Sequence, residues 1–157
     1  MSPNNVITQR CLILETPLDP LMALRTFTER QNDAGAIVSF TGIVRGDDHV
    51  QTLTLSHYPG YTEQQIENLM ALATERFDLL DALAIHRVGT LKPGEPIVLV
   101  ATAAAHRRPA FEGADYLMDY LKSAAPFWKK EQRNDGSHWI EPTSRDIADR
   151  QRWESEP

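Results

Sequence analysis

The sequence predicts a single domain of the α+β class, and three observations lead to this prediction. Segments with strand and helix patterns follow one another in the order strand, helix, strand, strand, helix, strand, strand, helix. Neighbouring strand segments are joined by short turns, which favours a mixed, largely antiparallel sheet. The chain has 157 residues, of which 41% are hydrophobic, enough for one domain with its own core.

The N-terminal segment predicts a strand followed by a helix. Apolar residues alternate over residues 6–14, which predicts a strand that buries Cys11. Asp19 and Pro20 then fit the N-cap and the first position of a helix, and we expect Gly35 to end it.

The next two strands are expected to form a hairpin. Residues 36–44 (AIVSFTGIV) are largely apolar and rich in β-branched side chains, which predicts a buried strand. Residues 50–58 alternate between apolar and polar side chains. The polar turn at residues 45–48 is short enough to join the two strands as a hairpin.

The middle of the chain predicts a second helix and a second pair of strands. Thr62 and Gln65 have the spacing of a capping box, and apolar residues recur at helical spacing over 66–80. Residues 83–88 and 97–103 are then expected to be strands, with a turn between them.

The C-terminal third predicts a third helix and a tail. Pro109 is expected to open the helix, and Pro126 either ends it or begins a second short helix. Residues 141–157 are polar, so we expect a loosely held tail.

Composition excludes several classes of protein. The formal net charge of −6 disfavours nonspecific nucleic-acid binding, which needs a broad basic face. No apolar run reaches the ~20 residues of a membrane span, and the N-terminus lacks an export signal, so we expect a cytoplasmic protein. Cys11 is the one cysteine, and the five histidines lack metal-ligating spacing. We therefore expect neither a metal nor a bound cofactor.

Cations gather around an aromatic segment near the C-terminus. Lys122, Lys129 and Lys130 flank Phe127 and Trp128. On an uninterrupted helix, a spacing of seven residues puts Lys122 and Lys129 on one face, and Pro126 interrupts the helix, so this geometry is approximate. Burial beside aromatic rings would lower the pKa of a lysine and suit it to nucleophilic attack or proton transfer. The alternative is a solvated helix end whose lysines interact with the helix dipole.

A second cationic segment precedes the third helix. His106, Arg107 and Arg108 lie where a strand ends and a helix is expected to begin. Backbone N–H groups at a helix N-terminus attract anions, and arginines add phosphate contacts. Arg45, at the end of the strand at 36–44, is a weaker candidate for the same pocket. The alternative, in which these side chains turn to solvent or to acidic neighbours, stays open.

Five segments together closely resemble the large, catalytic subunit of molybdopterin synthase, the MoaE family. In chain order they are GAIVSFTGIVRG, LTLSHYPGYTE, IHRVGTLKPGE, AHRR and YLKSAAPFWKKE, which begin at residues 35, 53, 85, 105 and 120. The resemblance implies a single-domain fold of the α/β-hammerhead type. We expect a catalytic domain over residues 1–140 and a polar tail over 141–157.

The resemblance also implies a reaction. Members of this family convert cyclic pyranopterin monophosphate into molybdopterin by inserting two sulfurs as a dithiolene. The sulfur arrives as a thiocarboxylate on the C-terminal Gly-Gly of a small ubiquitin-like subunit. The family assembly is a heterotetramer built on a homodimer of large subunits, so we expect both kinds of partner for this chain.

Site residues carry over position by position. Lys122 and Lys129 match the two lysines of the family's pocket, and Lys122 is the first candidate for the essential catalytic group. His106 and Arg107 match the substrate-binding pair. The other matches are Ile43, Val44, Arg45, Lys130 and Glu131 for substrate binding, and Phe40, Met118, Phe127 and Trp128 as pocket walls.

The chain departs from the family pattern in two places. Ile43 stands where the family commonly has a lysine, so the resemblance leaves only a backbone contact at that position. The turn after Arg45 is also shorter than in relatives, which bears on the contact with a partner. Two other hypotheses stay open: a binding module that has lost its chemistry, and a domain that binds RNA or a phosphate ligand through the same cations.

Overall fold

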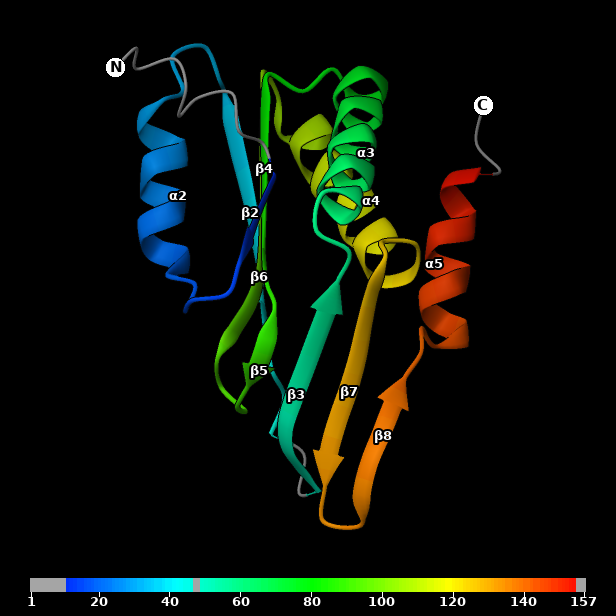
Figure 1. The fold of residues 1–157 in the computed structure, drawn as a ribbon. Coiled ribbons are helices and arrows are strands. Elements are labelled where there is room, and N and C mark those ends of the chain that lie inside the picture. Colours follow the sequence, from blue (N-terminus) through cyan, green and yellow to red (C-terminus); the bar gives the residue numbers. More distant parts are fainter. Residues whose placement is uncertain (1–10, 47–48, 155–157) are drawn as a thin grey trace.

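Two four-stranded sheets form the scaffold of the protein (Figure 1). The computed structural model describes residues 11–46 and 49–154. The first sheet has the order β1 (Cys11–Leu14), β4 (Asp81–Arg87), β6 (Pro96–Ala104), β2 (Ala36–Ile43). The second has the order β5 (Gly89–Leu91), β3 (Val50–His57), β7 (Phe127–Arg133), β8 (Gly136–Ile140). Among the described strands only β1 and β4 pair in parallel, which confirms the predicted α+β class with largely antiparallel pairing.

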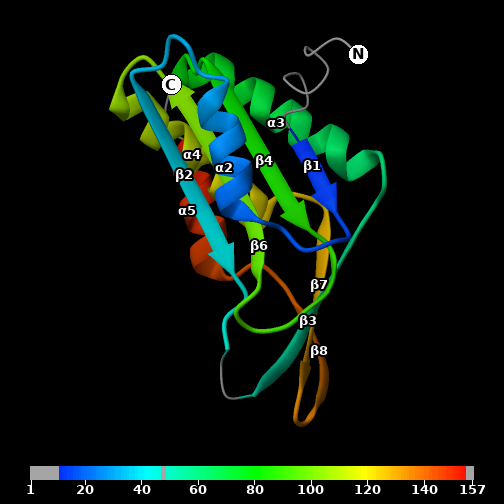
Figure 2. The same cartoon turned by 90° about the vertical axis from the view of Figure 1, so that its left-hand side faces the viewer.

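Helices cover both faces of the first sheet. Helix α2 (Pro20–Glu29) lies on one face, and α3 (Tyr61–Phe77) and α4 (Arg107–Ser123) lie on the other (Figure 2). Strand β4 shows both contacts, because Leu83 and Ile85 pack with Phe27 of α2 while Ala82 and Ala84 join the larger core under α3 and α4. A strand with both faces covered is expected to be apolar, as residues 82–85 of β4 are.

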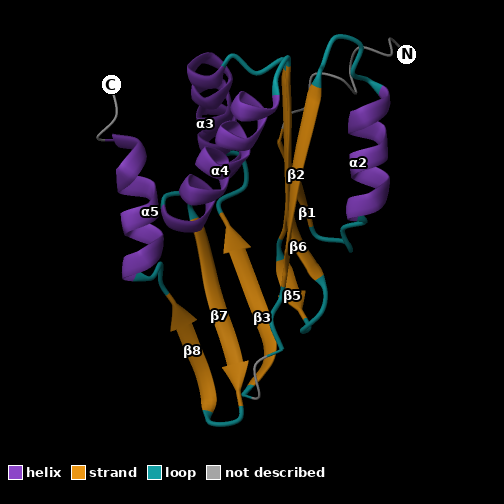
Figure 3. Ribbon diagram, turned by 180° about the vertical axis from the view of Figure 1, so that it is seen from behind, coloured by secondary structure: helices purple, strands orange, loops and turns teal. Residues whose placement is uncertain are grey.

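The second sheet extends beyond the helices (Figure 3), and large side chains on one of its faces are exposed. Along β7, Lys129 and Glu131 face inward, while Trp128 faces outward and is 42% exposed. Trp139 on β8 is 66% exposed. The half-polar sequence of β3 fits this environment, since alternating polar residues meet the solvent.

Two helices begin or end at residues other than those expected. Helix α2 stops at Glu29 rather than near Gly35. The Arg30 guanidinium makes two bonds to the carboxylate of Asp81, of 2.7 and 3.1 Å, and the Gln31 amide donates to Asp81 as well. These tertiary bonds hold the chain as it leaves the helix.

Helix α3 is capped differently from the prediction. Glu63, not Gln65, closes the capping box on the backbone of Gly60. The hydroxyl of Thr62 instead accepts from the Tyr58 backbone N–H and donates to the carbonyl of Pro126. It thereby ties the start of α3 to the chain between α4 and β7.

The predicted hairpin of residues 36–44 and 50–58 is wrong. Strand β2 pairs with β6 in the first sheet, and β3 pairs with β5 and β7 in the second. The expected burial of the first of these strands is also wrong, because β2 lies at an edge of the first sheet and none of residues 36–43 is fully buried. Its apolar sequence still suits the helix-covered first sheet, whereas the half-polar β3 suits a sheet with one exposed face. The two segments therefore separate into different sheets.

The helix ends before Pro126, which confirms one alternative, and the chain after Pro126 is a strand, so the other alternative of a second short helix is wrong. Residues 127–133 form β7, whose register with β3 places Lys129 opposite Leu55. The expectation that Lys122 and Lys129 share a helix face is therefore wrong, because Lys122 lies in the last turn of α4 and Lys129 in β7. The short strands β5 and β8 were not predicted.

The expected loose tail is largely a packed helix, α5 (Ser144–Glu154). Trp153 is 7% exposed, its ring packs on Phe77 and Tyr116, and its Nε1–H donates to Asp119 over 2.7 Å. A large buried aromatic anchor near the end of the segment orders it. The division between a domain and a tail at residue 140 stays a prediction.

Some predictions lie outside the described residues, namely the strand over 6–10 and the turn residues 47–48. The rest of that strand is β1. Across the described part of the chain, no helix is long and apolar enough to cross a membrane.

Candidate active site

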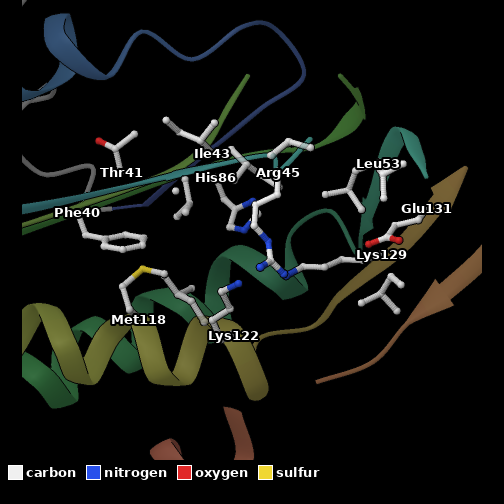
Figure 4. A pocket seen from close by; sticks show the side chains of 17 residues that line it. Phe40, Thr41, Ile43, Arg45, Leu53, His86, Met118, Lys122, Lys129 and Glu131 are labelled. Atoms are coloured by element: carbon white, nitrogen blue, oxygen red, sulfur yellow. The ribbon is translucent and has the colours of Figure 1, made fainter. Parts of the chain in front are cut away.

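A cavity of about 380 Å³ lies between the two sheets (Figure 4). The first sheet contributes residues from β2, β4 and β6, and the second contributes residues from β3, β7 and β8. The last turns of α4 form the remaining wall through Met118, Leu121 and Lys122. Elements distant in sequence therefore meet at one site.

Three cationic side chains line this cavity: Arg45, Lys122 and Lys129. Arg45 follows β2, Lys122 lies in the last turn of α4, and Lys129 faces inward from β7. None of them has an ion-pair partner within 4 Å among residues 11–46 and 49–154. Glu131 also lines the cavity, but Arg133 holds its carboxylate over 2.7 Å. The site thus presents unpaired positive charge in an acidic protein, which suits an anionic ligand.

Lys129 has the most strongly altered acidity of these cations. Burial and, to a lesser extent, repulsion from Lys122 lower the pKa of Lys129 from its ordinary 10.5 to about 8, while Asp146 opposes the change. Roughly a tenth of the Lys129 side chains are then neutral at pH 7, and a neutral amine can accept a proton or attack as a nucleophile.

His86 also faces the cavity, and the sequence reasoning missed it as a site residue. It lies in β4 with the same parity as Ala82 and Ala84, so it points toward the helices that cover that face. Its ring stacks on Phe127 with centroids 4.1 Å apart. The segment IHRVGTLKPGE, which carries the family resemblance, contains His86, but this histidine was considered only as a possible metal ligand.

The structure brings together eight of the predicted site residues. Those that line the cavity are Phe40, Ile43, Val44, Arg45, Met118, Lys122, Lys129 and Glu131. Phe127 stacks on the His86 ring. Trp128 and Lys130 lie on the outward face of β7, where the Lys130 ammonium sits 5.3 Å from the Trp139 ring centre. These three are not among the lining residues.

His106 and Arg107 lie at the opposite end of α4 from Lys122. His106 is the N-cap of the helix, and both side chains are exposed. Fifteen residues separate Arg107 from Lys122, which is about 22 Å along a helix. Within one chain, this pair does not reach the cavity.

The described residues offer neither a metal site nor a reactive thiol. No group of three His, Cys, Asp or Glu side chains among them is placed to hold a metal ion. Cys11 is buried, and burial together with Glu67 and Glu63 raises the pKa of its thiol to about 12. The thiol therefore stays protonated and is a poor nucleophile.

Comparison with known proteins identifies the family. A model of the MoaE protein family matches residues 13–124. The chain belongs to the MoaE family. The molybdopterin synthase catalytic subunit of Caulobacter vibrioides is 48% identical over 145 residues, which are 92% of this chain and 97% of that protein.

Solved MoaE structures have the same fold. The molybdopterin biosynthesis MoaE protein of Burkholderia ambifaria superposes with a TM-score of 0.81 at 40% identity and covers 95% of this chain and all of that one. A chain from a complex of subunits 1 and 2 of molybdopterin-converting factor from Helicobacter pylori shares the fold, with a TM-score of 0.72 at 23% identity. It covers 86% of this chain and 91% of that one. The MoaE resemblance of the sequence motifs is confirmed.

Proposed function

We propose that this chain is the catalytic subunit of a molybdopterin synthase. It converts cyclic pyranopterin monophosphate into molybdopterin by transferring sulfur from a thiocarboxylated partner. The observation that supports this most strongly is the cavity in which Lys122, Lys129 and Arg45 meet, in a chain 48% identical to a protein of that name.

The cavity fits the charges of such a reaction. The substrate brings a phosphate, and the sulfur donor brings an anionic C-terminus, so the site must hold two anions. Three cations without ion-pair partners among the described residues can balance them. A volume of about 380 Å³ also falls in the usual range for small-molecule sites.

The lysines have different roles in the proposal. Lys122 is the essential catalytic group, assisting proton transfer or the acyl intermediate. Lys129 holds substrate and, with its lowered pKa, exchanges a proton near neutral pH. The buried Cys11 is a poor sulfur donor, which agrees with sulfur arriving from outside the chain.

The sulfur donor in the proposal is a small ubiquitin-like subunit whose C-terminal Gly-Gly thiocarboxylate enters the cavity. The Helicobacter pylori relative of the same fold was solved as a complex of two subunits, which supports an assembly of this kind. A cytoplasmic location belongs to the same proposal.

A homodimer through the edge of β2 completes the site. Strand β2 ends the first sheet, so its outer edge has no strand neighbour within the described residues. Phe40 and Ile43 are 43% and 55% exposed there. A long apolar edge strand is normally covered, and a second copy of β2 in antiparallel pairing would cover it.

This pairing also gives His106 and Arg107 a role. Ala36, at the start of β2, pairs with Ala104 at the end of β6, two residues before His106. Antiparallel pairing of two β2 strands would set the start of one opposite the end of the other. The second copy's His106 and Arg107 would then lie near Arg45 of the first.

Reconstitution tests the proposed reaction. The chain is mixed with thiocarboxylated small subunit and cyclic pyranopterin monophosphate, and the dithiolene product is measured. We expect product from the intact chain, none from Lys122→Ala, and full activity from the control Arg25→Ala, which alters an exposed pair on α2. Partner binding without product from the intact chain would instead support a binding module.

Mixed dimers test the shared site. Copies with His106→Ala and Arg107→Ala are combined with copies that have Lys122→Ala. Each variant alone is expected to be inactive, and the mixture is expected to regain activity, because some cavities receive intact residues from both copies. Absence of recovery in a mixture shown to exchange subunits would contradict the shared site.

A further inference from the structure

The two ring nitrogens of His86 have different surroundings. Nδ1 lies 2.9 Å from the backbone carbonyl oxygen of Arg87. A carbonyl oxygen only accepts hydrogen bonds, so Nδ1 bears the hydrogen and donates it. In the neutral ring, Nε2 is then an acceptor with a free lone pair.

Nε2 of His86 opens into the cavity. The residue is 6% exposed and lines the cavity, and its only hydrogen bond in the described chain is made by Nδ1. The enclosed side-chain nitrogens and oxygens without a partner among the described residues are Nε of Arg87 and Nε of Arg150. Nε2 is not one of them, so a ligand in the cavity can reach it.

The ring is also held in place. Phe127 stacks on it at an interplanar angle of 24°, and the bond to the Arg87 carbonyl fixes its rotation. Two supports of this kind set the direction of the Nε2 lone pair before any ligand binds.

The other polar side chains that line the cavity donate hydrogen bonds or are already bonded, or they point away from the cavity. Arg45, Lys122 and Lys129 donate hydrogen bonds when charged. The carboxylate of Glu131 is bonded to Arg133, and the hydroxyl of Thr41 points away from the cavity in Figure 4. Nε2 of His86 is thus the neutral, unoccupied side-chain acceptor in the described lining.

We propose that His86 is a substrate-binding residue whose Nε2 accepts a hydrogen bond from an N–H or O–H group of the substrate's heterocycle. The cations hold the phosphate, and His86 orients the ring system relative to them. This inference rests on the proposed function, because it takes a nitrogen-rich heterocycle with a phosphate as the ligand.

The electrostatics of the site agree with a neutral acceptor. Burial, together with the charges of Lys129, Lys122 and His57, lowers the pKa of His86 to about 4, and the bond to Arg87 partly opposes the change. At neutral pH the ring therefore keeps its lone pair, and it does not repel the neighbouring ammonium groups.

Two substitutions distinguish the contributions of the two ring nitrogens of His86. In His86→Asn, the short amide can still donate to the Arg87 carbonyl but does not reach the Nε2 position. In His86→Gln, the longer side chain can place an amide oxygen near the Nε2 position. His138→Asn is the matched control, since His138 is bonded to Asp135 and lies outside the cavity lining.

Binding of cyclic pyranopterin monophosphate and of inorganic phosphate is measured by calorimetry without the partner subunit. For His86→Asn we expect about ten- to a hundred-fold weaker binding of the precursor, the range for a lost hydrogen bond in a buried site, with phosphate affinity unchanged. His86→Gln recovers part of the loss, and His138→Asn binds both ligands as the intact chain does. If His86→Asn fails to fold, His86→Phe keeps the stacked ring without the acceptor and gives the same expectation.

Two results would overturn the inference. One is unchanged precursor affinity in the His86 variants, and the other is an equal loss for precursor and phosphate, which indicates a distorted cavity rather than a lost acceptor. Because no turnover is required, an intact chain that binds precursor but forms no product counts against the proposed function alone. An intact chain that turns over, with His86→Asn binding precursor normally, counts against His86 alone.

Discussion

Replacing Lys129 with methionine should make the protein more stable at neutral pH while removing a cation from the site. Burial is the main reason that the pKa of Lys129 falls from 10.5 to about 8. The folded state therefore disfavours the charged side chain, whereas the unfolded chain solvates it freely. Methionine has a similar length and no charge to bury.

The size and the pH dependence of this gain follow from the pKa values. The difference between 10.5 and about 8 corresponds to roughly 3 kcal/mol at 1.36 kcal/mol per pKa unit. Water reaching the half-buried ammonium reduces the expected gain to about 1–2 kcal/mol. As the pH falls from 10.5 to 8, the unfolded chain binds the proton and the folded chain does not, so the penalty grows; below pH 8 it is fully present.

Urea unfolding at pH 7, 8.5 and 10 measures the effect. We expect Lys129→Met to exceed the intact chain in free energy of unfolding at pH 7, with the gain shrinking toward zero as the pH approaches 10.5. Lys130→Met, on the outward face of the same strand, is the matched control. A gain at pH 10 as large as the gain at pH 7, an equal gain in the control, or no gain at pH 7 would refute this account of the buried lysine.

Two further predictions concern the scaffold that positions the site. Trp153→Ala removes a side chain that is 7% exposed and packs on α3 and α4, so we expect a loss of about 3–5 kcal/mol in urea unfolding. A loss below 1 kcal/mol would mean that α5 is not anchored by this ring. Gly35→Ala would place a Cβ against the backbone carbonyl oxygen of Ala105, which cannot move aside as a side chain can. We expect it to cost about 1–3 kcal/mol, and a neutral result in thermal unfolding would contradict the close approach.

The order of most elements could be predicted from the sequence because the spacing of apolar residues indicates which face of a helix or strand is buried. Strand β6 and helices α3 and α4 follow their apolar patterns closely. Pairing of the strands could not be predicted in the same way. A short turn at residues 45–48 suggested a hairpin, but the difference between an apolar β2 and a half-polar β3 decides which sheet each one joins.

The region after Pro126 is a second part of the fold that could not be predicted from the sequence. The spacing of Lys122 and Lys129 gave the right pair of cavity residues for the wrong reason, since one lies in a helix and the other in a strand. Pairing with β3 turns Lys129 inward, and the residues around Lys129 do not by themselves indicate this long-range contact. His86 was missed for a similar reason, because its role depends on the cavity that distant elements form around it.

A crystal structure of the Lys122→Ala variant with cyclic pyranopterin monophosphate bound tests the central claim most directly. We predict that the precursor occupies the cavity between the two sheets, with its phosphate within hydrogen-bond distance of Arg45 or Lys129. A precursor bound elsewhere on the protein, with this cavity empty in every copy, would contradict the assignment of the site.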